Sequence, residues 1–175
     1  MAREPVEPDA SPLGRYDPES GEHLYEVRLL NLPVRLLAAG REHHDEVMRE
    51  FAVLALDESP SRHELPARMV ELIDVLGRRY GARTARPDAE IDDAIARGET
   101  SIDVVYHVPS HVSEAADRLE SLMAEADDFC RDRQLLSLAR PEVQVRFAHW
   151  YLEEFRRQIG GEPPNPWDGP LDYGS

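Results

Sequence analysis

The chain has 175 residues, of which 41% are hydrophobic and 31% charged, and its formal net charge at pH 7 is -15. This composition is ordinary for a soluble globular protein, and the length fits a single compact domain. The strong negative charge repels phosphate backbones and anionic lipid surfaces, so we expect neither a nucleic acid nor a membrane as a partner.

The basic residues are unusual, because all 20 are arginine and the sequence contains no lysine. Folding does not require this, whereas a genome of high GC content produces it together with abundant Ala, Pro and Asp. We therefore infer a bacterial source, and an actinobacterial one by preference. The lack of lysine excludes Schiff-base catalysis, a lysine general base and a P-loop.

The cysteine content and the hydropathy of the sequence indicate the cellular compartment of the protein. The single cysteine, Cys130, excludes an internal disulfide and a metal site made of cysteines alone. The sequence shows no apolar signal-peptide region, and no run approaches the roughly 18 apolar residues of a membrane span. We therefore expect a cytoplasmic protein.

Three segments differ in composition. Residues 1–21 are polar and rich in Pro, Asp and Glu, and they are predicted to be disordered because they cannot bury enough apolar surface to offset the entropy lost on ordering. Residues 22–160 are predicted to form one globular domain. Residues 161–175 form a Pro-rich tail without a helix or strand pattern, although its aromatic side chains could dock on the domain or on another chain.

The most strongly patterned stretch runs from Leu32 to Leu56 and predicts a long amphipathic helix. Leu37, His44 and Phe51 fall on its apolar side at helical spacing, while the other side carries Glu, Asp and Arg. Pro33 suits the first turn of a helix, where its missing N–H is not needed. We expect the rest of the chain to cover the apolar side.

Periodicity also predicts the remaining elements. Alternation of apolar and polar residues predicts strands at 24–30 and 101–108. Helical spacing predicts further helices, which are 64–80, 87–98, 110–131 and 141–159. Gly81 stands where a glycine commonly ends a helix, and Ser110 where a serine commonly caps one. The fold class is therefore predicted to be α+β and mainly helical, with five or six helices packed with a small sheet of about two strands.

The histidines are the first candidates for chemistry. His107 and His111 flank the turn from the second strand into a helix, where two imidazoles could meet at the mouth of a pocket and bind a metal or a small molecule. The alternative is an ordinary polar turn. His44 is a third metal candidate, but its neighbour His43 points about 100° away from it on a helix, so the two cannot easily bind one ion. His44 is equally interpreted as a hydrogen-bonded core residue.

Other reactive side chains have simpler interpretations. Asp127 and Asp128 diverge on a helix and are predicted to be part of a solvated charged face. Cys130 lies on an apolar stripe and is predicted to be an inert buried thiol. The sequence contains no Gly-x-Ser-x-Gly, glycine-rich phosphate loop or HExxH motif. We therefore assign no catalytic residue and no cofactor.

The aromatic residues concentrate near the C-terminal end of the sequence. Exposed aromatic clusters mark binding surfaces, so we consider this group a candidate contact for a protein partner or a homodimer. For the aromatic residues of the helix 141–159, a packed core is the other interpretation. The candidate interaction surface consists of Phe147, Trp150, Tyr151, Phe155, Trp167 and Tyr173.

Three stretches resemble small proteins of actinobacterial partner-switching systems, namely RLLNLPVRLL (28–37), REHHDEVMREF (41–51) and WYLEEFRRQI (150–159). The order of a strand, an LP-containing helix and a helix ending at Gly81 is also similar to anti-sigma-factor ATP-binding kinases of the GHKL type. Where those kinases carry a metal-binding Asn and a catalytic Glu, this chain has Leu76 and Leu72. The resemblance therefore implies a regulatory role without ATP binding.

These observations favour a non-catalytic, cytoplasmic regulatory or adaptor protein of a bacterial signalling system, acting through protein contacts. The alternative is a metal-dependent or small-molecule-binding enzyme or sensor that uses His107 and His111. A further possibility is a ligand sensor whose pocket lies between the long helix and the strand 101–108.

Overall fold

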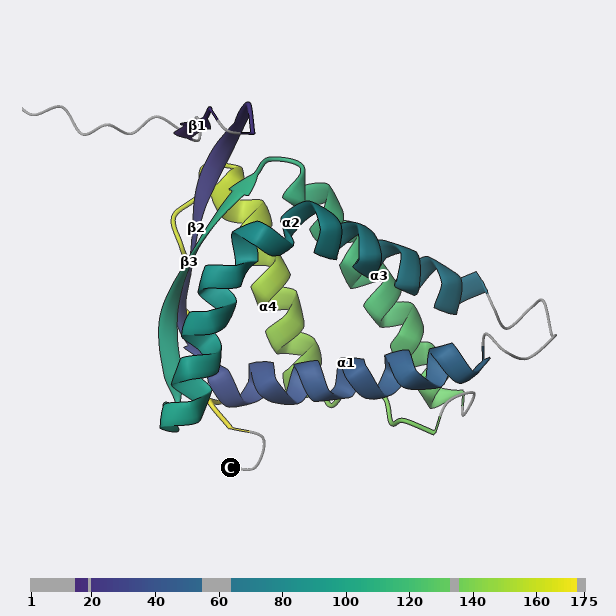
Figure 1. Ribbon diagram of the computed structural model, residues 1–175. Coiled ribbons are helices and arrows are strands. Elements are labelled where there is room, and N and C mark those ends of the chain that lie inside the picture. The colour runs from purple at the N-terminus through teal and green to yellow at the C-terminus, as the bar shows by residue number, and fades with distance from the viewer. Residues whose placement is uncertain (1–14, 19, 55–63, 133–135, 173–175) are drawn as a thin grey trace, which may run out of the picture.

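The computed structural model describes residues 15–18, 20–54, 64–132 and 136–172 (Figure 1). In these ranges the elements are β1 (Arg15–Asp17), β2 (Glu22–Pro33), α1 (Val34–Leu54), α2 (Glu64–Arg97), β3 (Ser101–Pro109), α3 (Val112–Arg131) and α4 (Glu142–Ile159). The predicted class, a mainly helical α+β domain, is confirmed, with three strands in place of about two. None of these helices is both long enough and apolar enough to cross a bilayer.

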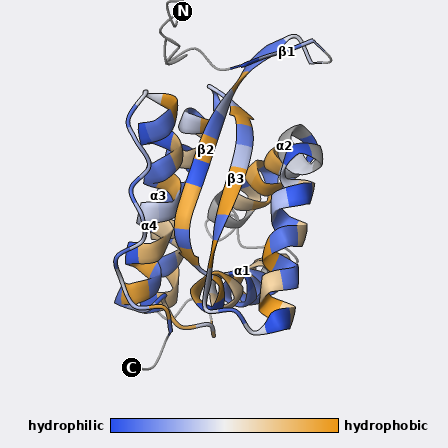
Figure 2. Ribbon diagram, turned by 90° about the vertical axis from the view of Figure 1, so that its left-hand side faces the viewer, coloured by the Kyte–Doolittle hydropathy of each residue, from blue (hydrophilic) through white to orange (hydrophobic). Residues whose placement is uncertain are grey.

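The sheet is antiparallel in the order β1-β2-β3. Val27 of β2 lies opposite Tyr106 of β3, and buried side chains alternate with exposed ones along both long strands. Most of the exposed side chains are polar, as the colours show in Figure 2, with Val105 of β3 as an apolar exception. Both predicted strands are therefore confirmed. A bulge between Leu29 and Leu32 places Asn31 at φ 56, a left-handed conformation that Asn tolerates better than most residues.

β1 lies within the segment that was predicted to be disordered. Arg15 and Asp17 pair with β2, and the turn between the strands contains Gly21 at φ 71. Arg83 of α2 holds this hairpin through ion pairs to Asp17 at 3.5 Å and Glu22 at 3.2 Å. The prediction is therefore wrong for this hairpin, while residues 1–14 lie outside the described residues.

α1 follows β2 directly and confirms the long amphipathic helix. Leu32 and Pro33 end the strand and are not yet helical, so the helix begins two residues later than predicted. Leu36, Val47 and Phe51 are buried on its inner side. Leu36 and Val47 are eleven residues apart, and Val47 and Phe51 are four apart. These spacings place all three side chains on the same face of the helix, as the sequence pattern predicts.

α2 is one helix where two were predicted. Gly81 does not end it, and Pro87 lies inside it although proline removes a helix hydrogen bond. Ile91 and Ala94 are completely buried and hold the last part of α2 in the core. Packing therefore overrides the local stop signals, and the helix changes direction along its length (Figure 1).

The core consists of two hydrophobic clusters. One joins the inward faces of β2 and β3 to α4, and its members include Leu29, Tyr106 and Phe155. The other joins α1, the beginning of α2 and α3 around Phe51 and Leu122. The two clusters lie at different ends of α1. The region where they meet is therefore where the helices can leave a cavity.

The C-terminal segment after α4 packs on the domain itself. Trp167 is only 2% exposed, and its backbone N–H donates to the Leu30 carbonyl at 3.0 Å. The Gln158 side chain bonds both the N–H and the C=O of Arg28, each at 2.8 Å. Asn31 Nδ2 donates to the Trp167 carbonyl at 2.8 Å. These bonds cover the edge of β2, which would otherwise expose unpaired backbone groups.

Candidate functional site: a cavity between four helices

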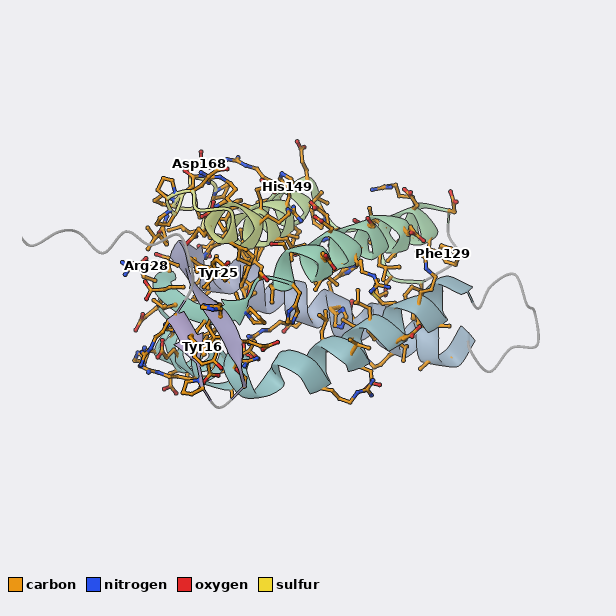
Figure 3. The ribbon with its side chains drawn as sticks, turned by 90° about the horizontal axis from the view of Figure 1, so that it is seen from above. Tyr16, Tyr25, Arg28, Phe129, His149 and Asp168 are labelled. Carbon is orange, nitrogen blue, oxygen red and sulfur yellow. The ribbon has the colours of Figure 1, made fainter. Side chains whose placement is uncertain are left out.

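A cavity of about 650 Å³ lies among α1, α2, α3 and α4. α3 and α4 (green) lie on one side of the molecule, and α1 and α2 (blue and teal) on the other (Figure 3). The volume falls within the range of pockets that hold small molecules in proteins. We call this space the main cavity. Its apolar wall comprises Leu37, Val47, Met48, Met69, Ile73, Leu119, Met123, Ala126, Phe147, Ala148 and Leu152.

The main cavity lies where the two hydrophobic clusters meet. Its wall includes Phe147 of the first cluster, and Val47 and Met69 of the second. Met48 and Met123 also line it, so every methionine in the described part of the chain contacts this space. Methionine is flexible and polarisable, and it lets one surface adapt to differently shaped apolar partners.

A close approach between α1 and α4 fixes one wall of the main cavity. A Cβ atom at Gly40 would lie 3.1 Å from Gln144 Oε1, which is tighter than an ordinary contact. The Gln144 amide is itself held, because its Nε2 donates to the Leu36 carbonyl at 2.9 Å. Glycine in the middle of a helix costs stability, and here it allows the two helices to meet.

A buried ion pair closes another part of the wall. Asp127 Oδ2 accepts a hydrogen bond from Arg140 Nη2 at 2.7 Å, and Asp127 Oδ1 accepts one from the Arg140 backbone N–H at 3.0 Å. The prediction of a solvated charged face is therefore wrong for Asp127, whereas Asp128 is exposed and pairs with Arg131. The pair joins α3 to the segment that leads into α4.

Both histidines of the adjacent pair line the main cavity. Burial lowers the pKa of the His44 imidazole below its ordinary value, although the nearby Asp45 carboxylate acts in the opposite direction. Burial and the Arg140 guanidinium likewise lower the pKa of His43, against the carboxylate of Asp127. Near neutral pH both rings are therefore uncharged and can donate or accept one hydrogen bond each.

His107 and His111, the other two candidate histidines, do not line this cavity. His107 is exposed on β3 with its Nε2 3.7 Å from Glu26 Oε2. His111 occupies the cap position of α3, where no side chain caps the helix, so the predicted Ser110 cap is wrong. Within the described ranges, no three or more His, Cys, Asp and Glu side chains form a group that could hold a metal. A metal site built on His44, His107 and His111 thus has no ligand set in this part of the chain.

A second cavity of about 390 Å³ adjoins the main one. Tyr151 lines both, and its hydroxyl donates to the Tyr106 hydroxyl at 3.2 Å. Val108 of β3 also lines the second cavity, whereas no residue of α1 does. The predicted pocket between α1 and β3 is therefore not a single space, because α1 borders one cavity and β3 the other.

The aromatic group does not form an exposed interaction surface. Trp150 and Phe155 are buried, and Phe147 packs against both Trp150 and Trp167, with ring centroids 6.0 and 5.7 Å away. Tyr151 is half-buried, and Tyr173 lies outside the described residues. The core interpretation is thus the correct one for Phe147, Trp150 and Phe155, and Trp167 docks on its own domain rather than forming a free surface.

Cys130 matches its predicted environment. The side chain is buried, and this burial raises the pKa of the thiol above its ordinary value, with the Asp127 and Glu50 carboxylates adding to the effect. A thiol with a raised pKa is a poor nucleophile near neutral pH.

Sequence patterns had indicated some parts of this site and not others. The apolar stripes of α1, α3 and α4 predicted which faces turn inward, but not that the faces would leave a space between them.

Comparison with protein-family models, curated proteins and solved structures found no match for this chain.

Proposed function

We propose that this protein is a non-catalytic regulatory protein that binds a small apolar molecule in the main cavity. The observation that carries the proposal is a space of about 650 Å³ whose wall is largely aliphatic and aromatic and includes Met48, Met69 and Met123. The space is partly open to solvent, so a ligand has a way in. A largely apolar space of this size between four helices is typical of ligand sites.

The polar groups of the wall support binding rather than catalysis. Asp127 and Arg140 neutralise each other, and Gln144 is held by a backbone carbonyl. His43 and His44 can each offer a hydrogen bond to a ligand, which would fix its orientation without reacting with it. Binding that orders the helices around the ligand would give the protein a ligand-dependent state suited to regulation.

The proposal is tested with phenylnaphthylamine, an uncharged apolar dye whose fluorescence rises when it leaves water. Ala148→Leu adds bulk inside the main cavity, whereas Ala124→Leu makes the same change on the exposed side of α3. We expect the wild-type protein and Ala124→Leu to bind the dye and Ala148→Leu to lose most of the binding. Circular dichroism establishes that both variants are folded. Equal binding by all three proteins would contradict the proposal.

A second candidate function, contact with a protein partner, is favoured by a different observation. Leu136 and Leu138 are 94% and 84% exposed. Their loop is nevertheless held in place, because the Glu50 carboxylate accepts the backbone N–H groups of Leu136 at 2.5 Å and Ser137 at 2.7 Å. Large exposed apolar side chains that a loop holds in place could anchor a protein contact.

This second candidate is tested by placing a photocrosslinking residue at position 138 and, as a control, at Val145, which is exposed on α4. We expect a discrete crosslinked species in lysate of the source organism from position 138 only. No crosslinking from 138, or equal crosslinking from both positions, would exclude a specific contact there.

A further inference from the structure

The main cavity and the second cavity share part of their walls. The shared residues are Ile73, Leu119, Tyr151 and Leu152. All four side chains have rotatable bonds, so a rotamer change in one of them would widen the opening between the two spaces. The wall of the second cavity is almost wholly apolar, with Thr84 and the tyrosine hydroxyls as its polar groups.

The charged groups of the main cavity, with the exception of Asp45, are already paired. Arg140 bonds Asp127, and Arg41 bonds Asp88 at 3.1 Å and Asp92 at 2.8 Å. Asp45 is the remaining ionic group in the wall and is exposed to solvent. An anionic ligand would therefore lose its hydration without meeting an unpaired guanidinium group, which is costly. A cationic ligand would meet only the Asp45 carboxylate, whose charge is screened because the residue is exposed to solvent. An anion would in addition meet a wall with more carboxylates than guanidinium groups.

The polar and apolar ends of the combined space are distinct. His43 and His44 belong to the α1 wall of the main cavity, and the second cavity has no α1 residue in its wall. Tyr151 lines both spaces, and so it lies between the histidines and the apolar end formed by residues such as Val108 and Ala115. A ligand with one polar group and a long apolar part matches this arrangement.

We infer that the two cavities bind one ligand, an uncharged molecule with a long hydrocarbon chain, such as a long-chain alcohol, ester or amide. Its polar group lies beside His43 and His44, and its chain passes Tyr151 into the second cavity. The inference rests on the proposed function, because it names the class of molecule that the main cavity takes. Long-chain carboxylates are not preferred, because both guanidinium groups of the wall are already paired. Long-chain amines are not preferred, because the one carboxylate of the wall without a partner among the described residues, Asp45, is exposed to solvent.

Three molecules with the same chain test the charge of the ligand. Decanol, decanoate and decylamine are compared at neutral pH for their ability to displace phenylnaphthylamine from the wild-type protein. We expect decanol to bind at least about tenfold more tightly than either charged molecule, the factor that about 1.4 kcal/mol represents. Equal or tighter binding of decanoate or decylamine would overturn the uncharged ligand and leave the proposed function standing.

A chain-length series tests whether the second cavity is used. From hexanol to hexadecanol, affinity for the wild-type protein should rise about fourfold for each added methylene until both cavities are filled. Ala115→Leu adds bulk to the second cavity alone. We expect this variant to bind hexanol as the wild type does, but to stop gaining affinity at a shorter chain. Ala124→Leu is the matched control.

The outcomes separate the two proposals. If Ala115→Leu shows the same chain-length series as the wild type, the second cavity is not part of the site. If no alcohol displaces a dye whose binding depends on Ala148, the ligand class is wrong although the main cavity binds apolar molecules. If the dye itself does not bind the wild-type protein, the proposed function fails as well.

Discussion

Asp127 of α3 holds Arg140 in an ion pair that is almost completely buried, with side-chain exposures of 3% and 8%. Asp127→Asn would leave the guanidinium buried without a counter-charge. We expect this change to lower the free energy of unfolding by about 3 to 5 kcal/mol, measured by urea denaturation.

The exposed pair of Arg68 and Glu125, at 2.9 Å, is the matched control. Glu125→Gln should cost at most about 1 kcal/mol, because solvent screens exposed ion pairs. Similar small losses from both variants would show that Asp127 and Arg140 are not buried together in solution.

Gly81→Ala tests whether α2 is one helix. In the structure Gly81 is inside α2, and a Cβ atom there would meet nothing within 4 Å. Alanine should therefore stabilise the protein by up to about 1 kcal/mol, since it has the higher helix propensity. Gly77→Ala, in the same open situation, should act likewise. If α2 instead ended at a left-handed Gly81, the alanine would destabilise the protein, and urea denaturation distinguishes the two signs.

Much of the fold could be predicted from local patterns. The strands around Val27 and Val104 and the helices α1, α3 and α4 have periodic apolar residues, and each was found close to its predicted bounds. β1 could not be predicted, because three residues are too few to show alternation. The continuity of α2 through Gly81 and Pro87 could not be predicted either. It depends on tertiary packing, because residues farther along the helix are buried in the core.

Less of the candidate site than of the fold could be predicted from the sequence. The pairing of Asp127 with Arg140 depends on how the chain turns between α3 and α4, and spacing alone does not show this. His44 was recognised as a residue of the inner face of α1, but a cavity is space left over after packing and has no pattern of its own. Phe147 and Trp167 were correctly grouped, yet they form a core because the C-terminal segment folds back.

The buried histidines give the protein a pH-dependent stability. Burial lowers the pKa of both His43 and His44 in the folded state below the ordinary 6.5. Below about pH 6.5 the unfolded chain therefore binds more protons than the folded one, and the free energy of unfolding should fall as the pH decreases toward the lowered pKa values.

We expect the double variant His43→Gln/His44→Gln to have a shallower loss of stability between neutral and mildly acidic pH than the wild type. Urea denaturation at a series of pH values measures this slope. Ala124→Leu, which keeps both histidines, should retain the wild-type slope. An unchanged slope in the double variant would contradict the buried, uncharged state of the two rings.

The C-terminal segment should contribute strongly to the free energy of unfolding. Trp167 packs against Phe147 and Trp150, and its indole N–H donates to the Pro170 carbonyl at 2.9 Å. Trp167→Ala should lower the free energy of unfolding by about 3 to 5 kcal/mol. Gly169→Ala should also destabilise, because a Cβ atom at Gly169 would overlap the Trp167 ring.

Pro163→Ala, at an exposed position of the same segment, is the control and should have little effect. Because Trp167 binds within its own chain, the thermal midpoints of wild type and variants should not change with protein concentration. A midpoint that rises with concentration in the wild type, and no longer does so in Trp167→Ala, would mean that the segment packs on another chain in solution.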